Sequence, residues 1–174
     1  MMSKIIAFAG LPGTGKTTLA RRLAEQLGAV LLNKDELRAA LFSPTDIEYS
    51  DRQNDFCMEV IYQLARYQLS HQPGRTIIID GRTFSRKQQL DALMEAMRSI
   101  PHQLYVVHCR CSLEIAEARI LNDHGSHPAR DRDAALVRRV AASFEGITMP
   151  HLVVDTGKLT AAEALSEIGK YVSS

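Results

Sequence analysis

The stretch Gly10-Leu11-Pro12-Gly13-Thr14-Gly15-Lys16-Thr17-Thr18 constrains the fold most, because it fits the pattern of a glycine, four residues and Gly-Lys-Thr. Glycines in such a loop let consecutive backbone N–H groups turn inward around a polyphosphate. The lysine places a mobile positive charge beside the β- and γ-phosphates, and the following hydroxyl is a ligand for Mg²⁺. We therefore predict a phosphate-binding loop with Lys16 as a catalytic residue and Thr17 as a metal ligand. The predicted nucleotide-binding residues are Gly10, Pro12, Gly13, Thr14, Gly15, Lys16, Thr17 and Thr18.

The residues on either side of this loop agree with that prediction. The apolar run 5–9 is typical of a buried strand, and the loop is followed by a helical stripe made of Leu19, Ala20, Leu23, Ala24 and Leu27. A helix that begins at the loop directs its N-terminal dipole at the bound anion. The alternative is an ordinary glycine-rich turn between a strand and a helix.

Composition indicates a single domain over residues 1–174. The chain is 45% hydrophobic and 24% charged, and its 174 residues are enough to bury a substantial core. Its three cysteines, Cys57, Cys109 and Cys111, do not form an even disulfide framework, so we expect a reducing, cytoplasmic setting. The first strand begins too early for a signal peptide, and no apolar run approaches a membrane span.

A second polar cluster, Asn33-Lys34-Asp35-Glu36-Leu37-Arg38, follows the short apolar strand 30–32. Ligands gather where the strands of an α/β sheet end, so Asp35 is a candidate general base for an attacking hydroxyl. Arg38, one helical turn later, is a candidate to hold an anionic group of the same acceptor. The alternative makes Asn33 or Asp35 only the N-cap of the next helix, with Glu36 completing a capping box.

Two more arginines are candidates for acceptor binding. Arg52 lies at the start of a helix predicted over 51–70, whose expected apolar stripe is Phe56, Val60, Leu64 and Tyr67. Arg82 follows the apolar strand 76–80 at the predicted sheet edge. A solvated helix start and a surface loop explain these two arginines equally well.

The strand 76–80 ends in Asp80, in the position of a carboxylate that holds Mg²⁺ through water. The helix after it is predicted to begin with a capping box of Ser85 and Gln88. Further strands are expected over 103–109 and 151–155, and a last helix is expected to be capped by Thr160 with Glu163.

The segment at about 119–133 is predicted to be a lid, because it is polar and contains glycine and proline. Lids of phosphoryl-transfer enzymes bring arginines onto the transferring phosphate after closure. Arg119, Arg130 and Arg132 are the candidates, with Arg130 assigned as catalytic and Arg119 as nucleotide-binding. A solvated charged loop is the alternative.

Strands that alternate with helices require parallel pairing and right-handed crossovers, so five of them predict a three-layer α/β/α domain. With these motifs the chain resembles the P-loop kinases of the nucleoside-monophosphate-kinase-like branch. The phosphate loop followed by Asp35 and Arg38 is similar to the 5′-hydroxyl polynucleotide kinase domain, and Asp51-Arg52-Gln53-Asn54 before a long helix is similar to adenylylsulfate kinase. The resemblance implies the sheet order 2-3-1-4-5, ATP as the donor, Mg²⁺ as the cofactor and a lid arginine.

The resulting hypothesis is an ATP-dependent kinase acting on a hydroxyl of a small, anionic or nucleotide-like acceptor, as a monomer or homodimer. A 5′-hydroxyl polynucleotide kinase and an ATP-binding regulatory or toxin-like module remain alternatives. The charge balance disfavours nucleic acid, because 21 Lys and Arg stand against 20 Asp and Glu. The basic pairs Arg21-Arg22 and Arg138-Arg139 fall at helical positions that surface exposure explains.

Overall fold

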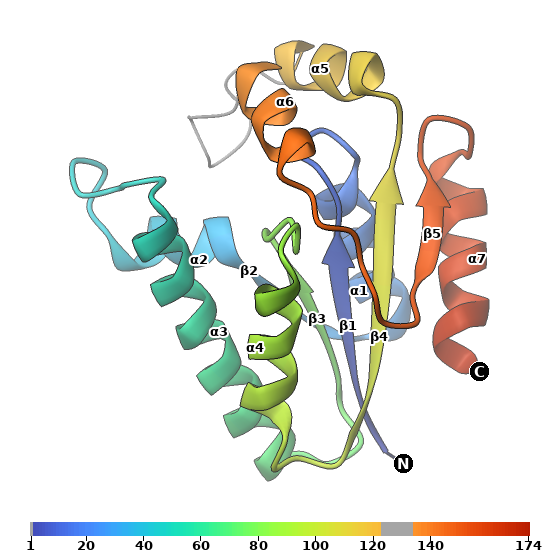
Figure 1. Cartoon of the computed structure of the whole chain (residues 1–174). Coiled ribbons are helices and arrows are strands. Elements are labelled where there is room, and N and C mark those ends of the chain that lie inside the picture. Colours follow the sequence, from blue (N-terminus) through green and yellow to red (C-terminus); the bar gives the residue numbers. More distant parts are fainter. Residues whose placement is uncertain (1, 123–133) are drawn as a thin grey trace.

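The central strand β1 (Ser3–Ala9) pairs in parallel with a strand on each side, in a computed structural model that describes residues 2–122 and 134–174. The other strands are β2 (Val30–Asn33), β3 (Thr76–Asp80), β4 (His102–Arg110) and β5 (Leu152–Asp155). Their order is β2-β3-β1-β4-β5, and every pairing is parallel. The predicted order and the three-layer α/β/α arrangement are thus confirmed (Figure 1).

Several helices begin or end where the sequence supplies a cap. They are α1 (Lys16–Leu27), α2 (Lys34–Leu41), α3 (Asp51–His71), α4 (Lys87–Met97), α5 (Leu113–Asn122), α6 (Ala134–Ala142) and α7 (Ala161–Ser173). Gly28 ends α1 in the left-handed conformation, and Thr160 with Glu163 forms the predicted capping box of α7. In the part of the chain that is described, no helix has both the length and the apolar character needed to cross a membrane.

Alternate residues of β1 point into two separate cores, as the period of a strand requires. Ile5, Ala7 and Ala9 join a core covered by α3 and α4, whereas Ile6 and Phe8 join a core covered by α1 and α7. Each fully buried Ile or Phe side chain among them contributes about 1.5–3 kcal/mol. The sheet is therefore held from both faces, which fixes the positions of the loops at the ends of its strands.

The predicted apolar stripe of α3 was wrong. Phe56 and Tyr67 are 53% and 62% exposed, and the face that packs on the sheet consists of Met58, Ile61, Tyr62, Ala65 and Leu69. Both sets have helical spacing, so only the packing against the sheet distinguishes them. The predicted cap of α4 was also wrong by one position: Arg86 is the N-cap, and its N–H donates to the side chain of Gln89.

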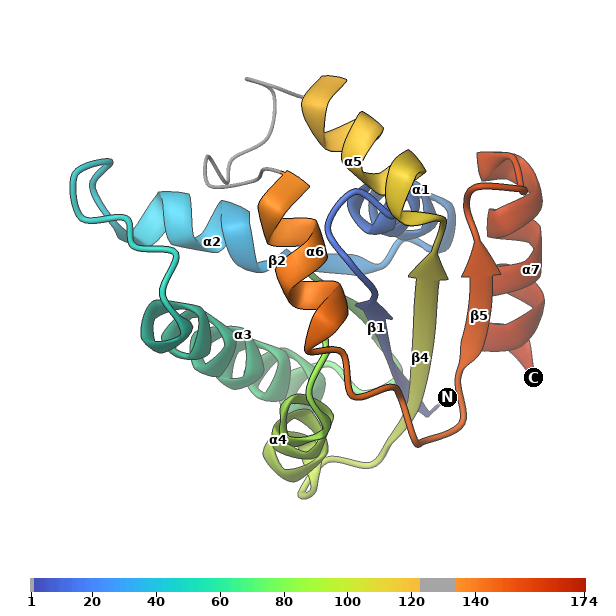
Figure 2. The ribbon, with the colours of Figure 1, turned by 45° about the horizontal axis from the view of Figure 1, so that its top comes forward.

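Helices α5 and α6 lie above the carboxyl ends of β1 and β4 in Figure 1, and Figure 2 shows α5 above the arrowhead of β4 from the turned view. They form a small third core in which Ala116, Ile120 and Val137 pack with Leu11 of the phosphate loop. The two helices are thereby attached to the edge of the sheet at which the polar clusters are expected.

Candidate active site

The phosphate loop leaves the end of β1 with a backbone that only glycine tolerates at its first position. Gly10 has φ +132°, and a Cβ atom there would lie 2.1 Å from the carbonyl oxygen of Cys109. Lys16, the first residue of α1, is buried, and its Nζ donates to the Leu11 carbonyl at 2.7 Å. The ammonium is thus held against the loop whose N–H groups are predicted to surround the phosphates.

Asn33 and Asp80 connect the ends of two neighbouring strands. They stand opposite each other in the register of β2 and β3, and Asn33 Nδ2 donates to Asp80 Oδ2 at 2.7 Å. Asn33 Oδ1 accepts from the backbone N–H groups of Asp35 and Glu36, at 2.9 and 3.0 Å. Asn33 is therefore the N-cap of α2, which leaves the Asp35 carboxylate unused by capping.

Gly81 makes this close approach of the two strand ends possible. Its φ is +93°, and a Cβ atom there would lie 2.9 Å from both the backbone nitrogen and the Cβ of Lys34. Contacts that short do not occur without movement of the backbone, so a larger residue would push α2 away from β3.

Asp35 is held between two cations. Its Oδ1 accepts from Arg38 Nη1 at 2.8 Å and lies 3.4 Å from Lys34 Nζ. Lys34 Nζ also donates to Asn54 Oδ1 at 2.8 Å, and Arg38 Nη2 donates to the same oxygen. Burial lowers the pKa of Lys34, an effect that the neighbouring Asp35 carboxylate opposes. The network orients the carboxylate, as a general base requires.

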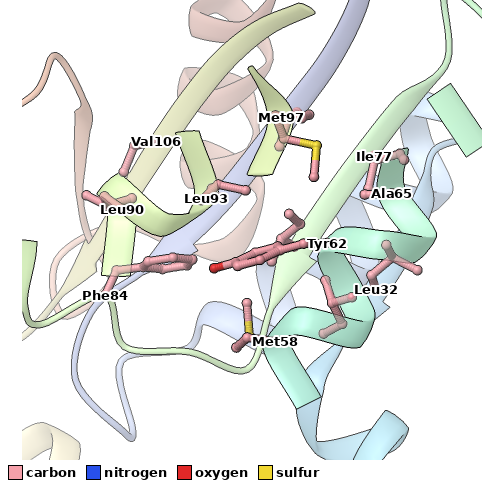
Figure 3. Close-up of a cluster of buried hydrophobic side chains, with 14 of the residues drawn as sticks. Leu32, Met58, Tyr62, Ala65, Ile77, Phe84, Leu90, Leu93, Met97 and Val106 are labelled. Carbon is pink, nitrogen blue, oxygen red and sulfur yellow. The ribbon is translucent and has the colours of Figure 1, made fainter. Parts of the chain in front are cut away.

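The loop after β3 carries two more arginines. Arg82 Nη2 donates to Asp55 Oδ1 at 2.6 Å, and Arg86 Nη1 donates to Asp51 Oδ2 at 3.3 Å. Phe84 anchors this loop in the core beside Tyr62 and Leu90 (Figure 3), although its φ of +50° is unfavourable for a residue with a side chain. Strain of this kind costs about 1–3 kcal/mol and recurs at functional sites.

Several of these side chains, among them Lys16, Asp35, Arg38, Arg82 and Arg86, line one cavity of about 490 Å³. The cavity collects residues from the phosphate loop, α2, the start of α3, the loop after β3, and α6. Of the predicted site residues, it is lined by Pro12, Lys16, Thr17, Asp35, Arg38 and Arg82. Arg52 is exposed and does not line it, so the structure does not bring Arg52 to the other candidates.

Arg119 lies at the other half of the sheet. Its guanidinium donates to Gly13 O at 3.4 Å and to Thr156 O at 2.7 Å, and Thr156 directly follows β5. It therefore contacts the phosphate loop from the β5 side, away from the ends of β2 and β3. Residues 119–122 of the predicted lid belong to α5, while Arg130 and Arg132 lie outside the described residues.

The sequence analysis missed three cations that line the cavity: Lys34, Arg86 and Arg139. Arg86 follows the same strand as Arg82, and this position could have been used to predict it as a site residue. Arg138 and Arg139 are both exposed, as expected, but Arg139 also lines the cavity, whereas Arg138 pairs with Glu117 at 2.6 and 3.1 Å. Which of the two arginines reaches the cavity depends on how α6 is rotated about its axis. No local pattern in the sequence indicates that rotation.

Asp80 suits a magnesium ion. Its side chain is fully buried, and its Oδ1 has no hydrogen-bond partner among the described residues. A buried carboxylate oxygen without a donor is costly unless a cation or water reaches it. Within residues 2–122 and 134–174, no cluster of three or more His, Cys, Asp or Glu side chains is suited to a metal, so such an ion would depend on phosphate oxygens as well.

The chain matches one family model and is similar to several kinases. A family model described as AAA domain (AAA_33) matches residues 5–147. The adenylate kinase of Paracoccus denitrificans is 39% identical over 100 residues, which is 53% of this chain but only 45% of that protein's own length. The adenylyl-sulfate kinase of Bacillus velezensis is 25% identical over 178 residues, covering 99% of this chain and 86% of that protein.

A solved structure of similar fold is the APS kinase of Mycobacterium tuberculosis in complex with AMPPNP and APS. It superposes with a TM-score of 0.73 at 16% identity and covers 99% of both chains. These findings confirm the predicted resemblance to P-loop kinases.

Proposed function

The chain belongs to the AAA domain family, and on that premise we propose that it is an ATP-dependent kinase that phosphorylates a hydroxyl of a small anionic acceptor. One observation carries the proposal: a single cavity is lined by Lys16 and Thr17 of the phosphate loop and by Asp35 and Arg38 of α2. Phosphoryl transfer needs a phosphate-binding loop and a base that face the same space. The names of the adenylate kinase and adenylyl-sulfate kinase relatives support the same class of reaction.

The transfer uses Asp35 as the proton acceptor. The acceptor's hydroxyl oxygen forms a bond to the γ-phosphorus while the bond from that phosphorus to the β–γ bridging oxygen breaks. ADP leaves with that electron pair, and the hydroxyl proton passes to the Asp35 carboxylate. Lys16 and the loop N–H groups stabilise the charge on the phosphoryl oxygens, because they are already oriented before the reaction.

Mg²⁺, held by Thr17 and Asp80, would supply further neutralisation of the phosphate charge. The neighbour whose structure contains AMPPNP supports ATP as the donor. We assign Arg119, at the β5 side of the phosphate loop, to donor binding, with the loop residues Gly10, Pro12, Gly13, Thr14, Gly15 and Thr18.

Arginines complete the proposed site. Arg38 and Arg82 are assigned to the acceptor's anionic group, since both line the cavity near the strand ends. Arg130 is proposed to reach the transferring phosphate from the segment between α5 and α6. Arg139 lines the cavity from α6 and joins them as a candidate.

A screen of acceptors tests the proposed function. Sugars, sugar phosphates, nucleotides and 5′-hydroxyl oligonucleotides are offered with ATP and Mg²⁺, and ADP release is measured together with the mass of the product. We expect ADP release to depend on one class of acceptor and to match the amount of phosphorylated product. ADP release that is the same with and without every acceptor would contradict the proposal.

A further inference from the structure

Positive charge outweighs negative charge in the cavity that contains Asp35. Among the described residues it is lined by two acidic side chains, Asp35 and Asp51, and by six cationic ones: Lys16, Lys34, Arg38, Arg82, Arg86 and Arg139. On the proposed function, Lys16 serves the donor's phosphates, and the remaining cations face the acceptor and the transferred group. A carboxylate carries one negative charge, whereas a phosphate monoester carries about 1.5–2 at neutral pH. The excess of positive charge favours a phosphorylated acceptor.

Arg82 and Arg86, both in the loop after β3, belong neither to the phosphate loop nor to the Asp35 network. Their partners Asp55 and Asp51 have side chains that are 64% and 75% exposed. Ion pairs with such exposed carboxylates contribute only about 0–1 kcal/mol, so a bound phosphate can replace them. The Nε of Arg82 is buried and has no hydrogen-bond partner among the described residues, which leaves a donor for a ligand to satisfy.

Aromatic side chains are scarce in the same cavity. The chain has five Phe, five Tyr and no Trp, and all ten rings lie in the described residues. Of these rings, only that of Tyr49 lines the cavity, and the Arg38 guanidinium lies over it at 5.2 Å from the ring centre. Stacking on an aromatic ring contributes about 1–3 kcal/mol per base in proteins that bind nucleobases. The cavity offers a nucleobase little surface of this kind.

Neutral polar groups are present instead. Thr83, Ser85, Gln89 and Ser143 line the cavity together with Asn54. Hydroxyl and amide side chains both donate and accept hydrogen bonds, which matches the hydroxyl groups of a sugar or polyol.

We propose that the acceptor is a phosphorylated sugar or polyol without a nucleobase, whose phosphate is bound by Arg82 and Arg86. The inference rests on the proposed function, because it places the acceptor's free hydroxyl at Asp35. That hydroxyl receives the γ-phosphoryl group as described above, so the products are ADP and a sugar or polyol that carries two phosphates.

Four matched compounds separate the contribution of the phosphate from that of the base: ribose, ribose 5-phosphate, adenosine and AMP. Their affinities are measured by calorimetry on the whole chain saturated with AMPPNP and Mg²⁺, so that the donor site is filled. We expect ribose 5-phosphate to bind at least about 10-fold more tightly than ribose, since a phosphate adds several charge-assisted hydrogen bonds. We also expect AMP to bind less than about 10-fold more tightly than ribose 5-phosphate, because the adenine gains little stacking.

Glucose with glucose 6-phosphate, and sorbitol with sorbitol 6-phosphate, extend the comparison to longer acceptors. The inference is overturned if AMP binds more than about 10-fold more tightly than ribose 5-phosphate. It is also overturned if no phosphorylated sugar or polyol binds at least about 10-fold more tightly than its unphosphorylated form. Under either result, ADP release stimulated by AMP or by another acceptor would leave the proposed kinase function intact. If no compound stimulated ADP release, that result would count against both the inference and the proposed kinase function.

Arg82→Ala and Arg86→Ala test the phosphate site itself. We expect each variant to lose at least about 10-fold in affinity for the tightest-binding phosphorylated sugar or polyol while AMPPNP affinity stays unchanged. Arg138→Ala, which removes an arginine of α6 that pairs with Glu117 outside the cavity, is the matched control. Thermal unfolding verifies that each variant folds. If Arg82→Ala does not fold, the affinity of Arg86→Ala alone tests the phosphate site. Unchanged affinity in a folded variant would overturn the assignment.

Discussion

Asp35 and Asp80 are two carboxylates at neighbouring strand ends that their surroundings suit to different tasks. Asp35 accepts from Arg38 and faces the cavity, whereas Asp80 is fully buried and accepts from Asn33. A carboxylate that lines the cavity can take a proton from a bound hydroxyl. A buried carboxylate with an unpartnered oxygen is instead suited to a cation. The division depends on Asn33, which both caps α2 and binds Asp80.

Asp35→Asn removes the proton acceptor but keeps the size of the side chain. We expect turnover to fall by about 10²–10⁴, the usual contribution of a positioned base, with ATP affinity unchanged. Steady-state kinetics with the preferred acceptor and calorimetry with ATP measure the two quantities. Asp91→Asn, which removes an exposed carboxylate of α4 paired with Lys87, is the control and should behave as the parent chain. A loss of ATP binding in Asp35→Asn would indicate that Asp35 has a structural role and is not the base.

At the scale of helices and loops, the sequence predicted those parts of the site that local patterns encode. The phosphate loop and Asp35 with Arg38 follow predicted strands, and Asp80 ends one, so the carboxyl edge of the parallel sheet brings them together. Arg139 and the buried face of α3 could not be predicted, because each depends on how a helix is rotated against distant elements. The positive φ of Phe84 and its burial in the core covered by α3 and α4 were equally hidden, because the contacts it makes there come from residues distant in sequence.

Gly81→Ala tests the close approach of β3 and α2. We expect a loss of unfolding free energy of about 1–2 kcal/mol from the positive φ, and about 1–3 kcal/mol more from the contact with Lys34. Gly146→Ala is the matched control, because Gly146 has φ +81° but a Cβ atom there would meet nothing within 4 Å. Urea unfolding of the two variants measures the difference. Equal destabilisation would show that the contact with Lys34 is unimportant.

Arg139→Ala and Arg138→Ala compare two neighbouring arginines of α6. We expect the change at Arg139 to lower kcat by about 10-fold or more with little effect on ATP affinity, because a guanidinium that lines the cavity acts on the transferring group. The change at Arg138 should leave kcat as it is, since that side chain pairs with Glu117. Rapid-mixing kinetics of a single turnover separate the two expectations. Identical kinetics in both variants would show that Arg139 of α6 does not contribute to phosphoryl transfer.

At the scale of the whole molecule, the cavity carries an excess of positive charge although the chain is nearly neutral. The net charge is only +1, yet among residues 2–122 and 134–174 the cavity is lined by six cations and two acids. A local concentration of this kind attracts a small anion, whereas a polynucleotide needs a basic track that neutralises several phosphates. The sheet supports this arrangement, because it holds the ends of β1, β2 and β3 at one edge.

This distribution predicts a weak dependence on salt. We expect kcat/KM for the preferred acceptor to change only modestly between about 50 and 200 mM salt, well short of the roughly 10³-fold loss typical of 6 to 10 phosphate contacts. The measurement is a series of initial rates at constant pH, with a 5′-hydroxyl oligonucleotide as the comparison. If the oligonucleotide were labelled efficiently at low salt and its labelling rate fell steeply as the salt concentration rose, a polynucleotide kinase would be favoured.

The fate of the γ-phosphoryl group tests the central claim most directly. ATP labelled with ³²P at the γ-position is mixed with the chain, Mg²⁺ and the preferred acceptor, and the label is followed into acceptor and inorganic phosphate. We predict that most of the label enters the acceptor, and that Lys16→Ala abolishes this transfer because water cannot replace the charge stabilisation in a closed site. Label that appears only as inorganic phosphate, or transfer that survives Lys16→Ala unchanged, would contradict the account.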